Sequence, residues 1–144
     1  MIPRARELQI VYSRGSNLAV LPQLSKPSDA AALLMNRLER EPVEVCHLLL
    51  LNTKHYVIAT HELSRGTLDS CSVHPRELFK VAILGNAAAV VVAHNHPSGD
   101  PTPSADDVAL CHRLRAAAEV IGVDILDFLI IGDGRYYSFK EAGR

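Results

Sequence analysis

The sequence predicts an α/β domain with three layers, in which helices flank a central mixed sheet that is largely buried. Three observations predict this class: apolar runs of strand length, amphipathic segments between them, and a length of 144 residues, which suits one domain. The composition is 48% hydrophobic and 22% charged, as in an ordinary globular protein. We expect the domain to span residues 27–144 and to follow an N-terminal extension over residues 1–26.

In the first half of the chain we expect one helix between strands. The elements expected here are a first strand over 8–12, a helix that begins at 28, and strands over 44–51 and 55–62. Ser28 favours a helix start, and the apolar side chains that follow recur at helical spacing as far as Leu38. Residues 48–51 are apolar throughout, which is typical of a strand covered on both faces. The turn-like residues 52–54 separate this strand from the next.

In the second half, helices and buried strands alternate. The elements expected here are a helix over 75–85, a strand over 87–93, a helix from 104 to 121, and strands over 125–131 and 135–138. Pro75 suits the first turn of a helix, and Ser104 is a favoured N-cap residue. Gly122 ends the second helix, and Asp133-Gly134 predicts a hairpin turn before the last strand.

Charge and cysteine content limit the classes of function. The net charge of −1 argues mildly against strong nucleic-acid binding, which usually requires a basic excess. Cys46, Cys71 and Cys111 are scattered without a C-x-x-C pair, so they predict neither a disulfide framework nor a thiolate zinc site. We expect Cys46 and Cys111, which stand in apolar runs, to be core residues. Residues 1–7 are too polar for a signal peptide, and no run is long enough to span a membrane. A cytoplasmic protein without a membrane partner is expected.

The most informative pattern joins two histidines and an aspartate. His94 and His96 stand at i and i+2 at a strand end, so their side chains can share one face. A loop rich in proline and glycine follows, and Asp107 lies in the first turn of the next expected helix. Two imidazoles and one carboxylate suit a zinc ion and leave a fourth position open, which is typical of catalytic sites. The pattern therefore predicts a metal that activates water.

Each of these residues also has a purely structural interpretation. A single histidine at a strand end is usually structural or solvated. Ser104 and Asp107 have the spacing of a helix capping box, and a helix start favours aspartate. Asp100 and Asp106 are rival ligands, although Asp106 and Asp107 project about 100° apart around a helix and cannot both face one ion.

Other catalytic motifs fit the sequence less well. It contains no H-E-x-x-H, no zinc-deaminase H-x-E with P-C-x-x-C, no Walker loop and no G-x-G-x-x-G. A Ser/His/Asp triad would use Ser98 or Ser104, but neither serine lies in a nucleophile elbow.

The segment from His94 to Asp107 resembles the JAMM (JAB1/MPN+) metalloprotease motif in its RadC-like form. That motif reads His-x-His, seven residues, Ser, two residues, Asp, and residues 97–103 and 105–106 supply the two spacers. The resemblance continues through Gly66-Thr67, residues 74–79, Leu126-Asp127 and residues 130–132, and covers residues 27–142. It implies a JAB/MPN (cytidine deaminase-like) fold over the catalytic domain. The family usually has Asp-His where this chain has Asp127-Phe128.

The resemblance also implies roles for individual residues. His94, His96 and Asp107 would bind one Zn²⁺ per chain. Glu44 would polarise the water, and Ser104 would donate a hydrogen bond to the oxyanion.

Glu44 is the least distinctive of these residues. Without the resemblance it is a solvated carboxylate before a strand. Glu39 and Glu41 are close in sequence, but they fall in the preceding helix end or loop.

The activity expected from the resemblance is zinc-dependent hydrolysis of a peptide or isopeptide amide bond in a protein or peptide substrate. One alternative is a metal-dependent enzyme that acts on DNA in repair. Full-length members of the family carry an N-terminal helix-hairpin-helix region linked to DNA, for which residues 1–26 are too short, so DNA gains little support. The other alternative is a non-catalytic zinc-containing interaction module. Modules of this fold commonly lose ligands, whereas this chain retains the full set.

Overall fold

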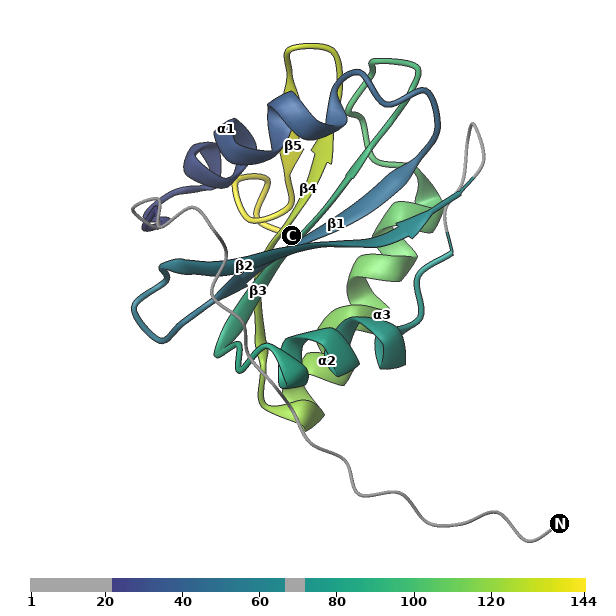
Figure 1. The fold of residues 1–144 in the computed structure, drawn as a ribbon. Coiled ribbons are helices and arrows are strands. Elements are labelled where there is room, and N and C mark those ends of the chain that lie inside the picture. Colours follow the sequence, from purple (N-terminus) through teal and green to yellow (C-terminus); the bar gives the residue numbers. More distant parts are fainter. Residues whose placement is uncertain (1–21, 67–71) are drawn as a thin grey trace, which may run out of the picture.

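A computed structural model of the chain describes residues 22–66 and 72–144 (Figure 1). Its elements, in chain order, are α1 (Pro27–Leu38), β1 (Val45–Leu51), β2 (Val57–Arg65), α2 (Pro75–Leu84), β3 (Ala89–Asn95), α3 (Ala105–Ile121), β4 (Asp124–Ile131) and β5 (Tyr136–Ser138). The strand expected over residues 8–12 lies outside the described residues, as does Cys71.

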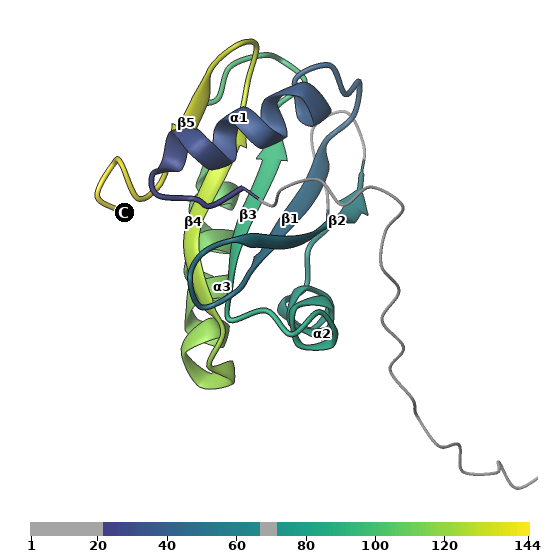
Figure 2. The same cartoon turned by 60° about the vertical axis from the view of Figure 1, so that its left-hand side comes forward.

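The strands form one five-stranded mixed sheet in the order β2-β1-β3-β4-β5. β3 and β4 run parallel, and the other neighbouring strands are antiparallel. α1 covers one face of the sheet, while α2 and α3 cover the other, as the two views in Figures 1 and 2 show. The predicted α/β class, with helices flanking a central mixed sheet, is confirmed.

Alternation along the two central strands divides the core into two halves. β1 and β3 are buried along their whole length, which confirms the strand character predicted for residues 48–51. Leu48 and Val92 pack in the half under α2 and α3, and Leu49 and Val91 pack in the half under α1. Burying one leucine side chain of this kind contributes roughly 1.5–3 kcal/mol. Because successive side chains alternate, the last residue of β3 faces the α1 half and the residue before it faces the α2/α3 half.

Some element boundaries differ from the sequence expectation. α1 begins at Pro27 because the Asp29 carboxylate accepts the main-chain N–H groups of Ser25 and Lys26, so Ser28 is not the cap. β3 is displaced two residues toward the C-terminus relative to 87–93, because its pairing with β1 begins only at Ala89. β2 continues to Arg65, beyond the expected end at 62, since β1 pairs with it along its whole length.

Other expectations are met. α2 begins with Pro75, and α3 begins after the N-cap Ser104 and ends at Ile121, before the C-cap Gly122, whose left-handed backbone has φ 84°. Cys46 and Cys111 are buried in the core. Within residues 22–66 and 72–144, no helix combines the length and apolar character of a membrane span.

Candidate metal centre

Three elements of the fold deliver the predicted metal ligands to one place. His94 is the penultimate residue of β3, and His96 is the first residue after Asn95 ends that strand. Asp107 lies in the first turn of α3. Glu44 immediately precedes β1, and the antiparallel pairing of Cys46 in β1 with His94 brings it beside the end of β3.

The four side chains converge closely. His94 Nε2 lies 3.0 Å from Asp107 Oδ1, and His96 Nε2 lies 3.0 Å from Asp107 Oδ2. Glu44 Oε1 lies 2.6 Å from His94 Nδ1. One ligand atom from each of the four residues lies within 4.8 Å of the others. The structure therefore brings together all four residues that the sequence analysis singled out around the metal.

The chemistry of this cluster fits a divalent cation. His94 is only 2% exposed, and among the described residues no hydrogen bond reaches its Nε2 atom, although Asp107 Oδ1 is close. Buried polar atoms are rarely left without a partner, and a bound metal would supply one. Two imidazoles with carboxylates form a donor set that suits zinc.

Hydrogen bonds on the far side of each ring select the ligand atom. The main-chain carbonyl of Asp100 lies 2.8 Å from His96 Nδ1, and Glu44 lies at the corresponding atom of His94. When Nδ1–H donates to these oxygens, Nε2 of each ring remains as the ligand. Both Nε2 atoms face Asp107, so the two histidines and the carboxylate point toward a common centre.

In the metal-free protein the two histidines hold protons strongly, whereas the Asp107 carboxyl stays ionised. Burial lowers the pKa of His94, but the adjacent Asp107 and Glu44 carboxylates outweigh burial and raise it to about 9. The Asp107 carboxylate also raises the pKa of His96, against partial burial. Burial acts to raise the pKa of Asp107, yet the two histidines hold it well below its usual range. A cation that binds here replaces protons that the two imidazoles hold.

The capping interpretation of Ser104 and Asp107 also holds. Ser104 Oγ accepts the N–H of Asp107 at 3.1 Å, and Asp107 Oδ2 accepts the N–H of Ser104 at 2.8 Å. The same Oδ2 atom lies beside His96, so the capping box fixes the carboxylate in the direction of the imidazoles. Ser104 itself lines the adjoining cavity.

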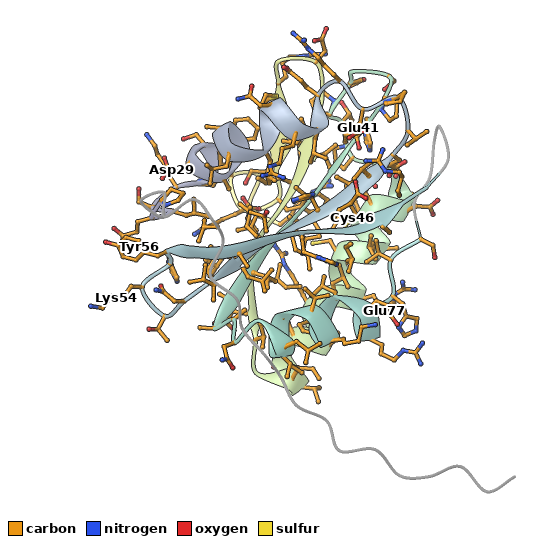
Figure 3. All side chains as sticks on the ribbon, viewed as in Figure 1. Asp29, Glu41, Cys46, Lys54, Tyr56 and Glu77 are labelled. Atoms are coloured by element: carbon orange, nitrogen blue, oxygen red, sulfur yellow. The ribbon has the colours of Figure 1, made fainter. Side chains whose placement is uncertain are left out.

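The rival carboxylates lie outside the cluster. Asp100 accepts the main-chain N–H and the hydroxyl of Thr102, and Asp106 is exposed. Glu41 instead forms an ion pair with Arg65 at 2.7 Å. Figure 3 shows Glu41 on the α1 side of the sheet and Glu77, on α2, on the other side.

A cavity of about 740 Å³ adjoins the cluster and is lined by all four of its residues. Phe128 forms part of the wall, and its ring packs edge-on against His94 with a centroid distance of 5.5 Å. Phe128 thus places an apolar surface on the buried imidazole. Asp127 points elsewhere, since it accepts the hydroxyl of Ser138.

Sequence reasoning missed one residue near the site. The side chain of Asn95 is 1% exposed and hydrogen-bonds to the main chain on both sides of Glu44. Its position between the two histidines, at the end of a buried strand, was the only local signal.

Fold and cluster together define an α/β domain with a candidate metal centre at the end of its central strands. The family model described as a RadC-like JAB domain matches residues 24–144, so the chain belongs to that family.

Curated relatives agree with this assignment. A UPF0758 protein of Desulforamulus reducens is 46% identical over 145 residues, which cover 97% of this chain and 64% of the relative. A UPF0758 protein of Clostridium perfringens is 47% identical over 119 residues, or 83% of this chain and 52% of the relative. A UPF0758 protein of Desulforudis audaxviator is 48% identical over 122 residues, which cover 85% of this chain and 53% of the relative. The chain thus spans between about half and two thirds of the length of these relatives.

Proposed function

We propose that the chain is a zinc-dependent hydrolase that cleaves a peptide or isopeptide amide bond in a protein or peptide substrate. The observation that carries this proposal is the convergence of His94, His96 and Asp107 with Glu44 beside them. When bound, zinc lowers the pKa of a water molecule from 15.7 to about 7 and polarises a substrate carbonyl. Family membership supports the same chemistry.

Glu44 has the position of a general base. Its carboxylate is 7% exposed and lines the cavity next to His94. In the proposed reaction the Glu44 carboxylate accepts a proton from water and passes it to the leaving amine, a role that typically accelerates a reaction 10²–10⁴-fold.

Ser104 is proposed to stabilise the oxyanion. Its Oγ accepts one N–H, and a hydroxyl that accepts a hydrogen bond can still donate one. A donor directed at the developing charge contributes about 2.7–4 kcal/mol. Phe128 and the buried strands exclude water around His94, which strengthens each electrostatic contact.

The test is hydrolysis by the zinc-loaded chain of a library of internally quenched peptides, extended with fluorogenic peptides joined through a lysine side chain. We expect Glu44→Gln to retain zinc and to lose turnover by roughly 10²–10⁴-fold. Glu41→Gln, which changes a nearby carboxylate paired with Arg65, serves as the matched control and should leave turnover unchanged.

Two outcomes would contradict the proposal. Unchanged turnover in Glu44→Gln would assign the base to another residue. Metal-dependent nicking of DNA that is lost in Asp107→Ala, without cleavage of any peptide, would favour the DNA-directed alternative.

A further inference from the structure

We infer that Asn95 is the positioning residue for Glu44, because its carboxamide holds both peptide groups that flank the Glu44 Cα atom. The catalytic consequence rests on the proposed function, whereas the structural part stands on hydrogen bonds alone. Asn95 lies between the two candidate histidine ligands, so one short segment would set the geometry of both the metal site and the base.

Asn95 forms two well-defined hydrogen bonds to these peptide groups, one buried and one partly buried, and we call this pair of bonds the clamp. Asn95 Oδ1 accepts the N–H of Val45 at 2.7 Å, and Asn95 Nδ2 donates to the carbonyl of Val43 at 3.0 Å. A longer contact of 3.4 Å joins Nδ2 to the carbonyl of Glu41. With Asn95 only 1% exposed, water cannot readily replace these partners.

These contacts fix the direction of the Glu44 side chain. The Val43 carbonyl belongs to the peptide plane before the Glu44 Cα atom, and the Val45 N–H belongs to the plane after it. Holding both planes restricts φ and ψ of Glu44, which together determine where its Cβ atom points. Gly66, which follows β2, donates its N–H to the Glu44 carbonyl at 2.9 Å. This is a second hydrogen bond to the peptide plane after the Glu44 Cα atom.

Main-chain pairing with β3 does not perform this task. Cys46 and His94 are the last pair in the β1–β3 register, so pairing of the two main chains ends before Glu44. The main chain of Asn95 pairs on its other side with Ile131 of β4. The Asn95 side chain therefore supplies hydrogen bonds beyond the last main-chain pair of β1 and β3. These bonds reach the segment between α1 and β1.

Only an amide side chain of the length of asparagine can form both hydrogen bonds. Val45 offers a donor and Val43 an acceptor, so the side chain between them must accept at one atom and donate at another. Aspartate would place an oxygen against the Val43 carbonyl, and leucine would leave both main-chain groups unpaired. Glutamine is one methylene longer in a buried position.

The first test is amide hydrogen exchange of Val45 in the full chain, measured by NMR. We expect Asn95→Ala to reduce the protection of Val45 at least tenfold relative to other amides of β1. Asn95→Leu, which keeps a similar volume, should do the same if alanine impairs folding. Unchanged Val45 protection in a folded Asn95 variant would overturn the inference.

Asn52→Ala is the matched control. Asn52 Oδ1 accepts the N–H groups of Lys54 and Tyr56, so this substitution also removes main-chain hydrogen bonds next to β1. Figure 3 shows Lys54 and Tyr56 at the opposite end of the β1–β2 hairpin from Glu41. We expect Asn52→Ala to leave the protection of Val45 and the zinc affinity unchanged.

The second test asks whether Asn95 acts through Glu44, using zinc affinity measured by competition with a chromophoric chelator. Losing the partner of a metal-ligating histidine typically weakens affinity 10–100-fold, and Glu44 is the partner of His94. We expect Glu44→Ala, Asn95→Ala and the double variant to weaken zinc by similar factors. If the two single losses multiply in the double variant, or Asn95→Ala has no effect, the inference is wrong.

Turnover separates this inference from the proposed function. With an active peptide substrate, Asn95→Ala should lower kcat toward the value of Glu44→Gln while KM stays the same. Hydrolysis that survives in Glu44→Gln would contradict the proposed function but leave the exchange and affinity results valid. Full turnover in Asn95→Ala, with turnover lost in Glu44→Gln, would contradict the inference alone.

Discussion

Glu44 Oε1 and His94 Nδ1 lie 2.6 Å apart although the two residues are separated by 50 positions in the sequence. The contact joins the residue before β1 to the penultimate residue of β3, and it is buried. It turns the opposite nitrogen of the ring toward Asp107. One contact thus orients a candidate ligand and places a candidate base within the same cavity.

Zinc binding should release protons at neutral pH. The pKa of His94 is raised to about 9, and that of His96 is raised as well, so the metal-free protein holds protons that neutral imidazole ligands must lose. Apparent affinity should rise with pH and level off above about pH 9. Titration calorimetry in buffers of different ionisation enthalpy measures the released protons. If zinc binding releases no protons at pH 7, the raised pKa values of the two histidines are contradicted.

The same shift predicts how pH affects the metal-free fold. Because the pKa of His94 is higher in the folded chain than its ordinary value of 6.5, its protonation stabilises the fold fully below pH 6.5. That contribution is lost as the pH rises through about 9. Denaturation of the chelator-treated protein at several pH values tests the direction, and greater stability at pH 9 than at pH 6 would oppose it.

Asp107→Asn and Asp106→Asn form a matched pair of neighbouring substitutions. Asp107 is 6% exposed and faces both imidazoles, whereas Asp106 is exposed. We expect Asp107→Asn to lose zinc under dialysis and Asp106→Asn to keep it. Metal analysis by mass spectrometry gives the answer, and equal retention by both variants would remove Asp107 from the ligand set.

Gly132→Ala should disturb the loop that connects His96 to α3. A Cβ atom at residue 132 would lie 2.3 Å from the Gly99 carbonyl oxygen and 2.8 Å from Pro101 Cδ. Overpacking of this kind costs about 1–3 kcal/mol, and the shift should reach His96 through the loop. We expect weaker zinc binding in the chelator competition.

Gly134→Asn is the control, because it replaces a glycine close to Gly132 without causing a steric clash. Its φ of 62° suits asparagine, and nothing lies within 4 Å of a Cβ atom there. Zinc affinity should be unchanged. If Gly132→Ala binds zinc as well as this control does, the loop does not set the position of His96.

Ser138→Ala should destabilise the domain without affecting the metal. The Ser138 hydroxyl donates to the buried Asp127 carboxylate at 2.5 Å and accepts the N–H of Glu141. Hydrogen bonds to charged groups contribute about 1.5–3 kcal/mol, so the urea midpoint should fall while the m-value stays the same. Ser28→Ala, at a partly exposed serine in α1, is the control, and an equal midpoint in both variants would refute this role.

Local pattern predicted the parts of the site that are close in sequence. The spacing of His94 and His96 and the helix start at Ser104 predicted the candidate ligands, which the structure brings together, because strand and helix periods determine which side chains share a face. Helical period alone did not choose between Asp106 and Asp107. The capping box identifies Asp107, because its carboxylate accepts the Ser104 N–H and also faces His96.

Contacts between distant segments were not predictable in this way. Glu44 followed from a family resemblance, because a glutamate before a strand has no distinctive pattern of its own. Asn95 was missed because its partners Val45 and Val43 lie 50 and 52 positions away. Both residues gain their surroundings only when β1 pairs with β3, which sequence periodicity does not specify.

The most direct test of the metal centre is anomalous X-ray scattering at the zinc edge from crystals of the zinc-loaded chain. We predict a single peak of about one zinc per chain, bounded by Nε2 of His94, Nε2 of His96 and the Asp107 carboxylate. A zinc peak elsewhere, with these three side chains contacting only one another, would contradict the account.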